Sequence, residues 1–408
     1  MTYDDIAAWA DRFDAADPLA AHAPAFVEAD GVHAYLDGNS LGRPLKATRD
    51  RLVDFLDGAW GERLIRSWDE QWFHAPTEVG DRIAALTLGS GPGQTIVADS
   101  TTVLLYKLVR AAVDGAEGRD EIVIDTGNFP TDRFVVEGIA AERGLRIRML
   151  DPDPAGGVTA DDVRAVVGER TALVLLSHVA YRSGHLADLV AITEAAHTAG
   201  AMVLWDLCHS VGVVDFSLDD AGVDLAVGCT YKYLNGGPGS PAFGYVSHMA
   251  QDRITQPIQG WMGAADPFAM GPSYVAADGI RAFISGTPPI LAMQPMLDML
   301  DLVEQAGIAA IRAKSVALTT FATDAADELL APLGVRLASP RDPDLRGGHV
   351  TLAHPDFREV TARAWQQGVI PDFRPPDGLR IGLSPLSTTF AEVARGIGAV
   401  ATLLSPEP

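Results

Sequence analysis

Short apolar runs alternate with helix-patterned segments through the middle of the chain, and this alternation restricts the fold more than any other feature of the sequence. The pattern predicts strands at 121–125, 146–150, 172–177, 201–206 and 225–229, and helices at 159–167 and 189–199. Apolar strands separated by amphipathic helices are typical of a mostly parallel α/β sheet that is covered on both faces. Such sheets bind ligands at the carboxyl ends of their strands.

The pattern changes near residue 290, which suggests a second folding unit. A long helical stretch at 291–330 is followed by HVTLAHP and LRIGLSP, which read as strands of a smaller α+β unit. With 408 residues the chain is long enough for more than one unit. We therefore expect an N-terminal segment (1–50), a large α/β domain (51–290) and a small C-terminal domain (291–408).

The composition excludes several classes of partner. A net charge of -23 and a pI near 4.7 repel nucleic acid and anionic lipid. The apolar runs are strand-length, well below the roughly 18 residues of a membrane helix. Two cysteines cannot form a disulfide framework, and the acidic start MTYDDIAAWADRFDAADP is unlike a signal peptide. We expect a cytoplasmic protein that binds neither nucleic acid nor membrane.

An acid and a lysine follow two of the predicted strands. AMVLWD ends in Asp206 and LAVGCTYK ends in Lys232, so both side chains are expected at one edge of the sheet. Pyridoxal phosphate needs this pair, because a lysine amine holds its aldehyde as a Schiff base and a carboxylate keeps its pyridine nitrogen protonated. From spacing alone, Asp206 could equally cap a helix and Lys232 could be a solvated loop residue.

The neighbours of the lysine favour a ligand site over a simple turn. Gly236-Gly-Pro-Gly239 frees the backbone for close approach to a ligand. Tyr231 adds a proton donor or acceptor of tunable pKa beside Lys232.

The segment WDLCHSVGVVDFSLDDAGVDLAVGCTYKYLNGGPGSPAFGYV closely resembles the cofactor-lysine segment of the kynureninase family. The resemblance extends in order over nearly the whole chain. Its other motifs are YLDGNSLGRP (35–44), WGERLIRSWDEQW (60–72), NFPTDR (128–133), HVAYRSG (178–184), QPIQGWMG (256–263), GTPPIL (286–291) and GVIPDFRPPDGLRIGLSPL (368–386).

The resemblance implies a fold type I pyridoxal-phosphate enzyme, with a mostly parallel seven-stranded sheet and a smaller C-terminal α+β domain. The implied activity is hydrolytic Cβ–Cγ cleavage of kynurenine, 3-hydroxykynurenine or both, giving anthranilate or its 3-hydroxy form and alanine, in tryptophan catabolism. It also implies a homodimer with shared active sites.

By position, the resemblance makes Lys232 the Schiff-base lysine, Asp206 the partner of the ring nitrogen and Tyr231 a proton-transfer residue. The remaining cofactor contacts that it implies are Thr101, Thr102, Phe129, Pro130, Thr131, Asp132, Ser177, His209, Trp261 and Thr287, the last two from the neighbouring subunit. Hydroxyls that precede a helical run also suit anion binding at a helix N-terminus. Plain alternatives stay open: an N-cap for the threonines, and a core phenylalanine with a capping aspartate for Phe129 and Asp132.

On the substrate side, the resemblance assigns Arg380 to the α-carboxylate, and a guanidinium suits a planar carboxylate. Ser40 and Trp68 match positions near the substrate, although Trp68 could equally be a core aromatic. One departure concerns the aryl group: Ala264 follows GWMG where many relatives have histidine.

Two other readings remain to be compared with the structure. A cysteine desulfurase-like lyase would need a reactive cysteine on a mobile loop, whereas Cys208 and Cys229 lie in or beside predicted buried strands. A catalytically silent module that only binds pyridoxal phosphate would not need all four of Lys232, Asp206, Tyr231 and Arg380.

Overall fold

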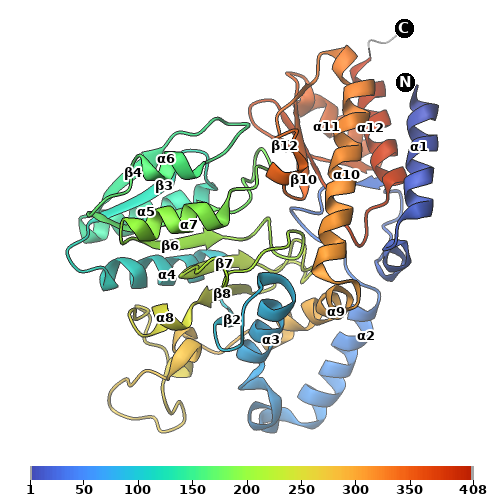
Figure 1. Cartoon of the computed structure of the whole chain (residues 1–408). Coiled ribbons are helices and arrows are strands. Elements are labelled where there is room, and N and C mark those ends of the chain that lie inside the picture. Colours follow the sequence, from blue (N-terminus) through green and yellow to red (C-terminus); the bar gives the residue numbers. More distant parts are fainter. Residues whose placement is uncertain (1, 406–408) are drawn as a thin grey trace.

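The computed structural model describes residues 2–405, and a seven-stranded sheet lies at its centre (Figure 1). In spatial order its strands are β2 (Thr95–Ala98), β8 (Ala242–Val246), β7 (Leu225–Cys229), β6 (Met202–Asp206), β5 (Thr171–Ser177), β3 (Glu121–Asp125) and β4 (Arg146–Leu150). The run from β7 to β4 is parallel, and β8 is antiparallel to both of its neighbours, β2 and β7. The mostly parallel sheet expected from the sequence is confirmed.

Helices cover both faces of this sheet. Successive residues of a strand point to opposite faces, so each buried strand contributes side chains to two cores. Val203 lies in one apolar core and Leu204 in the other, and both are fully buried. The core with Val203 also contains residues of α3 (Ala75–Ile83), α6 (Ala160–Arg164) and α7 (Leu189–Thr198). The opposite core contains residues of α4 (Thr101–Gly115), α5 (Pro130–Arg143) and α8 (His248–Gln251).

The C-terminal part forms a second, antiparallel sheet packed on helices. Its strand order is β12 (Asp372–Arg374), β13 (Gly378–Gly382), β10 (His349–Ala353) and β9 (Arg336–Leu337). Helices α10 (Ile308–Leu329), α11 (Phe357–Gln366) and α12 (Phe390–Leu404) share a core with this sheet, whereas α9 (Ile290–Ala306) contributes to a core of the seven-stranded sheet. The strands expected in HVTLAHP and LRIGLSP are confirmed. The helical stretch expected at 291–330 is observed as two helices, because Gly307, with φ 77° and ψ 136°, separates α9 from α10.

The N-terminal segment packs against the C-terminal elements. Helix α1 (Tyr3–Ala16) lies beside α12, as Figure 1 shows in blue and red. Strand β1 (Ala34–Tyr35) pairs in parallel with β11 (Val369–Ile370). The DGNSLG motif directly follows β1 and therefore lies near the second sheet. The domain boundaries expected at residues 50 and 290 stay a prediction.

Short helices complete the described part of the chain. Helix α2 (Ala47–Asp54) leads into wide π-type turns at η2 (Phe55–Glu62) and η4 (Trp68–Trp72), and a third lies at η5 (Ala84–Leu88). Tighter 3₁₀ turns lie at η1 (Ala20–Ala25), η3 (Leu64–Arg66), η6 (Trp261–Gly263), η7 (Gly279–Phe283), η8 (Ala331–Leu333) and η9 (Pro343–Leu345). Within residues 2–405, no helix combines the length and apolar character needed to cross a bilayer.

An aromatic cluster joins the N-terminal helix to the second core and yields a stability prediction. Phe321 of α10 is 1% exposed and contacts Trp9 and Phe13 of α1 at ring-centroid distances of 4.9 and 5.9 Å. We expect Phe321→Ala to lower the free energy of unfolding by roughly 3–5 kcal/mol, measured by urea denaturation. Phe134→Ala, at a 63% exposed site, is the control and should change it by less than about 1 kcal/mol. If both variants lowered the free energy of unfolding equally, the packing of Phe321 against α1 would be contradicted.

Candidate active site

The carboxyl edge of the parallel strands gathers most of the predicted site. Asp206 ends β6, Ser177 ends β5 beside it in register, and Lys232 follows β7 by three residues. Asp206 and Lys232 are 6% and 9% exposed. The solvated lysine that the sequence left open is therefore wrong.

Lys232 has a histidine as its near neighbour. The Lys232 Nζ and His209 Nε2 atoms lie 3.0 Å apart. Burial, followed by the charge of Lys232, holds the pKa of His209 well below its usual range, so this imidazole is neutral. His209 Nδ1 is buried and has no hydrogen-bond partner among the described residues. The Lys232 amine thus faces a neutral imidazole nitrogen.

Two carboxyl groups face each other next to Lys232. Asp132, in the first turn of α5, is 2% exposed. Burial raises the pKa of Asp132 well above its usual range, and the charge and hydrogen bonding of Asp206 raise it further. Asp132 therefore binds a proton more readily than an ordinary aspartate does. Asp206 Oδ1 also accepts from the Cys208 amide at 2.8 Å, while Asp132 Oδ2 has no hydrogen-bond partner within the described chain.

An aromatic ring and an amide lie on the same rim. Phe129, the residue before α5, is 37% exposed and meets the Tyr181 ring edge-on at 5.3 Å. It is therefore not a core phenylalanine. Ser177 Oγ donates to Asn128 Oδ1 at 2.9 Å. Pro130 and Thr131 form the start of α5 and are half-buried.

The two threonines open helix α4, whose first turn is free to bind an anion. Ser100 precedes them as N-cap but makes no side-chain capping bond. Thr101 is half-buried and Thr102 is exposed. A helix N-terminus with unused amides favours a phosphate.

A buried ion pair supports the turn before these threonines. Asp99 has a φ of 50°, a left-handed conformation that is unfavourable for a residue with a side chain. Lys107 Nζ bonds to Asp99 and, at 2.9 Å, to the Phe283 carbonyl oxygen. Lys107 is fully buried, so these two contacts offset the cost of removing its ammonium group from water.

Tyr231 and the two cysteines lie near Lys232. The Tyr231 ring centroid is 5.9 Å from Lys232 Nζ, and burial raises the pKa of the Tyr231 hydroxyl above its usual value. The phenol is therefore a neutral proton donor at physiological pH. Cys208 and Cys229 are unbridged and only 7% and 1% exposed, which leaves neither on a mobile loop.

Trp261, Thr287 and Trp68 make no hydrogen bond or ring contact with the Lys232 group in the described part of the chain. Trp261 is 41% exposed and Thr287 is exposed. Trp68 is half-buried, packs against both cores and meets Trp72 edge-on at 5.5 Å. The roles assigned to these three residues stay predictions.

Arg380 is buried at the interface of β13 with the DGNSLG segment. It donates to Ser40 Oγ at 2.6 Å, to Asp372 Oδ2 at 2.8 Å and to the Tyr181 carbonyl at 2.9 Å. Arg380 and Ser40, each expected near the substrate, are thus in direct contact, and their substrate role stays a prediction. With its side chain 1% exposed, Arg380 is not the exposed strand arginine that spacing alone allowed.

Several polar residues of this region were missed in the sequence. Asp37, Asn39, Asp372 and Arg374 surround Arg380. His349 is fully buried, lies 5.4 Å from His209 between ring centroids, and has no hydrogen-bond partner for either ring nitrogen among the described residues. All but His349 lie in the motifs DGNSLG and PDFRPPDG, so the clustering of charged residues within those motifs was the available signal.

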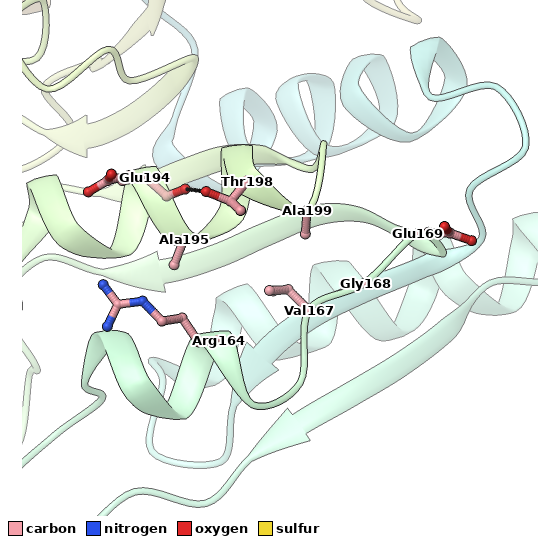
Figure 2. Close-up of a pocket in the computed structure, with 8 residues that line it drawn as sticks. All are labelled: Arg164, Val167, Gly168, Glu169, Glu194, Ala195, Thr198 and Ala199. Atoms are coloured by element: carbon pink, nitrogen blue, oxygen red, sulfur yellow. Dashed lines mark hydrogen bonds between the residues drawn. The ribbon is translucent and has the colours of Figure 1, made fainter.

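A separate hollow of about 500 Å³ lies between α6 and α7 (Figure 2). Gly168 and Glu169 precede β5, and Ala199 precedes β6, so this hollow is at the amino ends of the strands. It is opposite the edge where open α/β sheets bind their ligands. We assign it no part in the chemistry.

Comparison with known proteins places the chain in a family. Residues 311–400 match the family described as "Kynureninase C-terminal domain". The chain is 39% identical to the kynureninase of Pseudomonas fluorescens over 387 residues, covering 93% of this chain and 91% of that protein. It is also 39% identical to the kynureninase of Burkholderia pseudomallei (strain 1106a), covering 97% and 94%. The chain belongs to the kynureninase family.

The fold of this kynureninase-family chain is shared more widely. Residues 89–216 match the DegT/DnrJ/EryC1/StrS aminotransferase family. The cysteine desulfurase CsdA from Escherichia coli superposes with a TM-score of 0.80 at 16% identity, covering 95% of this chain and 98% of its own. A cysteine desulfurase from Thermococcus onnurineus NA1 gives 0.79 at 17% identity, covering 91% and 94%. This similarity shows that the fold is that of the type I pyridoxal-phosphate enzymes.

The buried ion pair below the threonines yields a prediction for this family member. Lys107→Met keeps the stem of the side chain but leaves Asp99 without its cation. We expect the free energy of unfolding to fall by about 3 kcal/mol, the lower end for breaking a buried pair, since Asp99 is 26% exposed. Urea denaturation measures the change.

The double variant Lys107→Met/Asp99→Asn is the matched control, because it also removes the unpaired carboxylate. It should regain part of the lost stability. The pairing would be contradicted if the double variant lost more free energy of unfolding than the two single variants lose together.

Proposed function

We propose that this chain is a pyridoxal-phosphate-dependent hydrolase of carbon–carbon bonds in ketonic substances. It cleaves kynurenine, 3-hydroxykynurenine or both to the corresponding anthranilate and L-alanine. The carrying observation is that a chain of this family, matched over nearly its whole length, buries Lys232 and Asp206 at one edge of its sheet.

The residues at this edge fit the cofactor, and three buried polar atoms without hydrogen-bond partners support this fit. Asp132 Oδ2, His209 Nδ1 and Asn128 Nδ2 are buried with no hydrogen-bond partner in the described chain, so polar atoms of a ligand would complete them. Lys232 would hold the aldehyde, the Asp132 and Asp206 pair the protonated ring nitrogen, and Thr101 and Thr102 the phosphate. Phe129 is exposed enough to cover the ring.

The bound cofactor supplies an electron sink for charge that develops on the substrate α-carbon. The chain supplies the groups that move protons and hold the substrate. Lys232 Nζ, next to a neutral His209, is the base for the α-proton. Tyr231, which keeps its proton, donates in the cleavage half of the reaction. Arg380 and Ser40 hold the substrate carboxylate and so orient the bond to be cut.

Two other readings are weaker. A desulfurase needs an accessible thiol, and both cysteines are buried. A silent module that only binds the cofactor has no use for a buried arginine beside a serine and two carboxylates.

We also propose a cytoplasmic homodimer in which Trp261 and Thr287 serve the neighbouring site. Exposed apolar side chains support this, since Ile65 is 75%, Met270 78% and Val275 65% exposed. Two buried, unbridged cysteines suit a reducing compartment. Which substrate is preferred depends on the aryl pocket, where Ala264 replaces the histidine of many relatives. A comparison of kcat/KM for the two substrates, with Ala264→His in parallel, decides it.

Lys232→Ala tests the function directly. The purified enzyme should show a visible absorption band and release fluorescent anthranilate from kynurenine, and the variant should lose both, because no other amine takes the place of Lys232. Lys46→Ala, at a lysine that donates only to the Pro24 carbonyl in the described chain, is the control and should keep both signals. If the band survives in Lys232→Ala, the lysine assignment is wrong.

A mixing experiment tests the shared site. Lys232→Ala and Trp261→Ala/Thr287→Ala should each be inactive alone, whereas a denatured and co-refolded mixture should regain roughly a quarter of wild-type activity. The reason is that half of the random dimers then carry one intact site. If the mixture stays inactive while co-refolded wild-type enzyme recovers, each site is built from a single chain.

A further inference from the structure

The surroundings of Arg380 contain a balanced set of charges. Arg374 Nε donates to Asp372 Oδ2 at 2.6 Å, and the same oxygen accepts from Arg380 Nη2 at 2.8 Å. Asp37 Oδ1 lies 3.7 Å from Arg380 Nη2. Two guanidinium groups thus face two carboxylates, and the net charge of this four-residue group, the arginine cluster, is zero when all are ionised.

Most N–H groups of Arg380 are already used. Its Nη2 donates to Ser40 and Asp372, and its Nη1 to the Tyr181 carbonyl at 2.9 Å. When the Asn39 amide is assigned with its oxygen toward Arg380, that oxygen accepts from Nε at 3.0 Å and the amide nitrogen donates to Asp37 Oδ1 at 3.2 Å. A guanidinium has five N–H groups, so one on Nη1 remains. Both guanidinium groups already have carboxylate partners, so a substrate carboxylate that binds here adds a third negative charge to the cluster.

A third carboxylate gives the arginine cluster a net charge of minus one. Arg380 is 1% exposed, and Asp37 and Asp372 are each 17% exposed, so water screens this excess poorly. The cluster can restore neutrality by binding a proton. Asp372 is directly bonded to both guanidinium groups. Asp37 has the longer contact to Arg380 and is the weaker-held anion.

The other titratable groups facing the cluster cannot easily provide that proton site. His209 and His349 are fully enclosed, and burial together with the charges of Lys232 and Arg380 holds the pKa of both well below the usual range. Tyr35 and Tyr233, which also face Asp37, have a pKa raised by burial and stay protonated. Burial, with a contribution from Asp372, raises the pKa of Asp37 to about 6, despite the Ser40 hydroxyl and the two arginines.

We propose that binding of the substrate carboxylate at Arg380 is coupled to uptake of a proton by Asp37. This inference rests on the proposed function only for placing the substrate carboxylate at Arg380. Asp37 is then a charge-compensating residue. Affinity for the carboxylate falls as pH rises through neutrality, because the free enzyme must bind a proton whose concentration in solution decreases.

The test uses 4-(2-aminophenyl)-4-oxobutanoate, which has the carboxylate and aryl ketone of kynurenine but no α-amine. Calorimetric titration of the holoenzyme at pH 7 in phosphate and in Tris gives the number of protons bound, from the difference in heat between the two buffers. We expect uptake approaching one proton, and a dissociation constant that is flat below pH 6 and rises up to roughly tenfold per pH unit above it. The inhibition constant against kynurenine gives the same slope if the heat is small.

Asp37→Asn provides the decisive comparison, because it removes the negative charge in advance. The variant should take up no proton, and at pH 8 it should bind the probe more tightly than wild-type enzyme does. A merely structural role of Asp37 predicts weaker binding instead. Asp30→Asn, at an exposed site on the same segment, is the control and should match wild type.

The inference is overturned if wild-type enzyme binds the probe without proton uptake, or if uptake persists in Asp37→Asn. Failure of the proposed function looks different. In that case wild-type enzyme releases no anthranilate from kynurenine, whatever the proton count with the probe.

Discussion

Everything at the site depends on parallel strand pairing, because it brings the carboxyl ends of β5, β6 and β7 to one edge. Ser177 and Asp206 are register partners across β5 and β6, and Asp206 pairs with Val227 across β6 and β7, five residues before Lys232. Residues far apart in sequence thereby become neighbours. The strands are buried on both faces, so a slip of register would exchange the two cores as well as the site.

Charge balance is the second organising constraint. At the sheet edge, one lysine lies near two acids, and burial beside Asp206 raises the pKa of Asp132. At β13, two arginines face two acids. Buried charges are tolerated only where partners compensate them. In the free protein, the charges in both clusters are balanced by their neighbours. A charged ligand must therefore be accompanied by proton uptake or release, or must replace existing contacts. The two sites can therefore bind only ligands whose charge and hydrogen-bonding groups fit this balance.

Much of this architecture was accessible from the sequence. All five strands predicted between residues 121 and 229 are observed with bounds that differ by at most one residue, because long apolar runs between polar turns leave little freedom. Lys232 and Asp206 were predicted from the same pattern. The break at Gly307 was missed, since helical spacing continues on both sides of it and only the backbone conformation reveals it.

Other features depend on tertiary contacts that no local pattern contains. The pairing of Asp132 with Asp206 joins α5 to β6, and the environment of Arg380 joins DGNSLG to two strands more than 300 residues later. Buried charges such as Lys107 look like ordinary surface residues in sequence, because their partners, Asp99 and the Phe283 carbonyl, are fixed by folding. Sequence motifs indicated the right regions, but not which members would be in contact.

A crystal structure with bound pyridoxal phosphate tests the central claim most directly. The account predicts continuous density between Lys232 Nζ and the aldehyde carbon, with the ring nitrogen within about 3 Å of the Asp206 carboxylate and the phosphate at the start of α4. A ring bound elsewhere, or one whose nitrogen faces away from both Asp206 and Asp132, would contradict it.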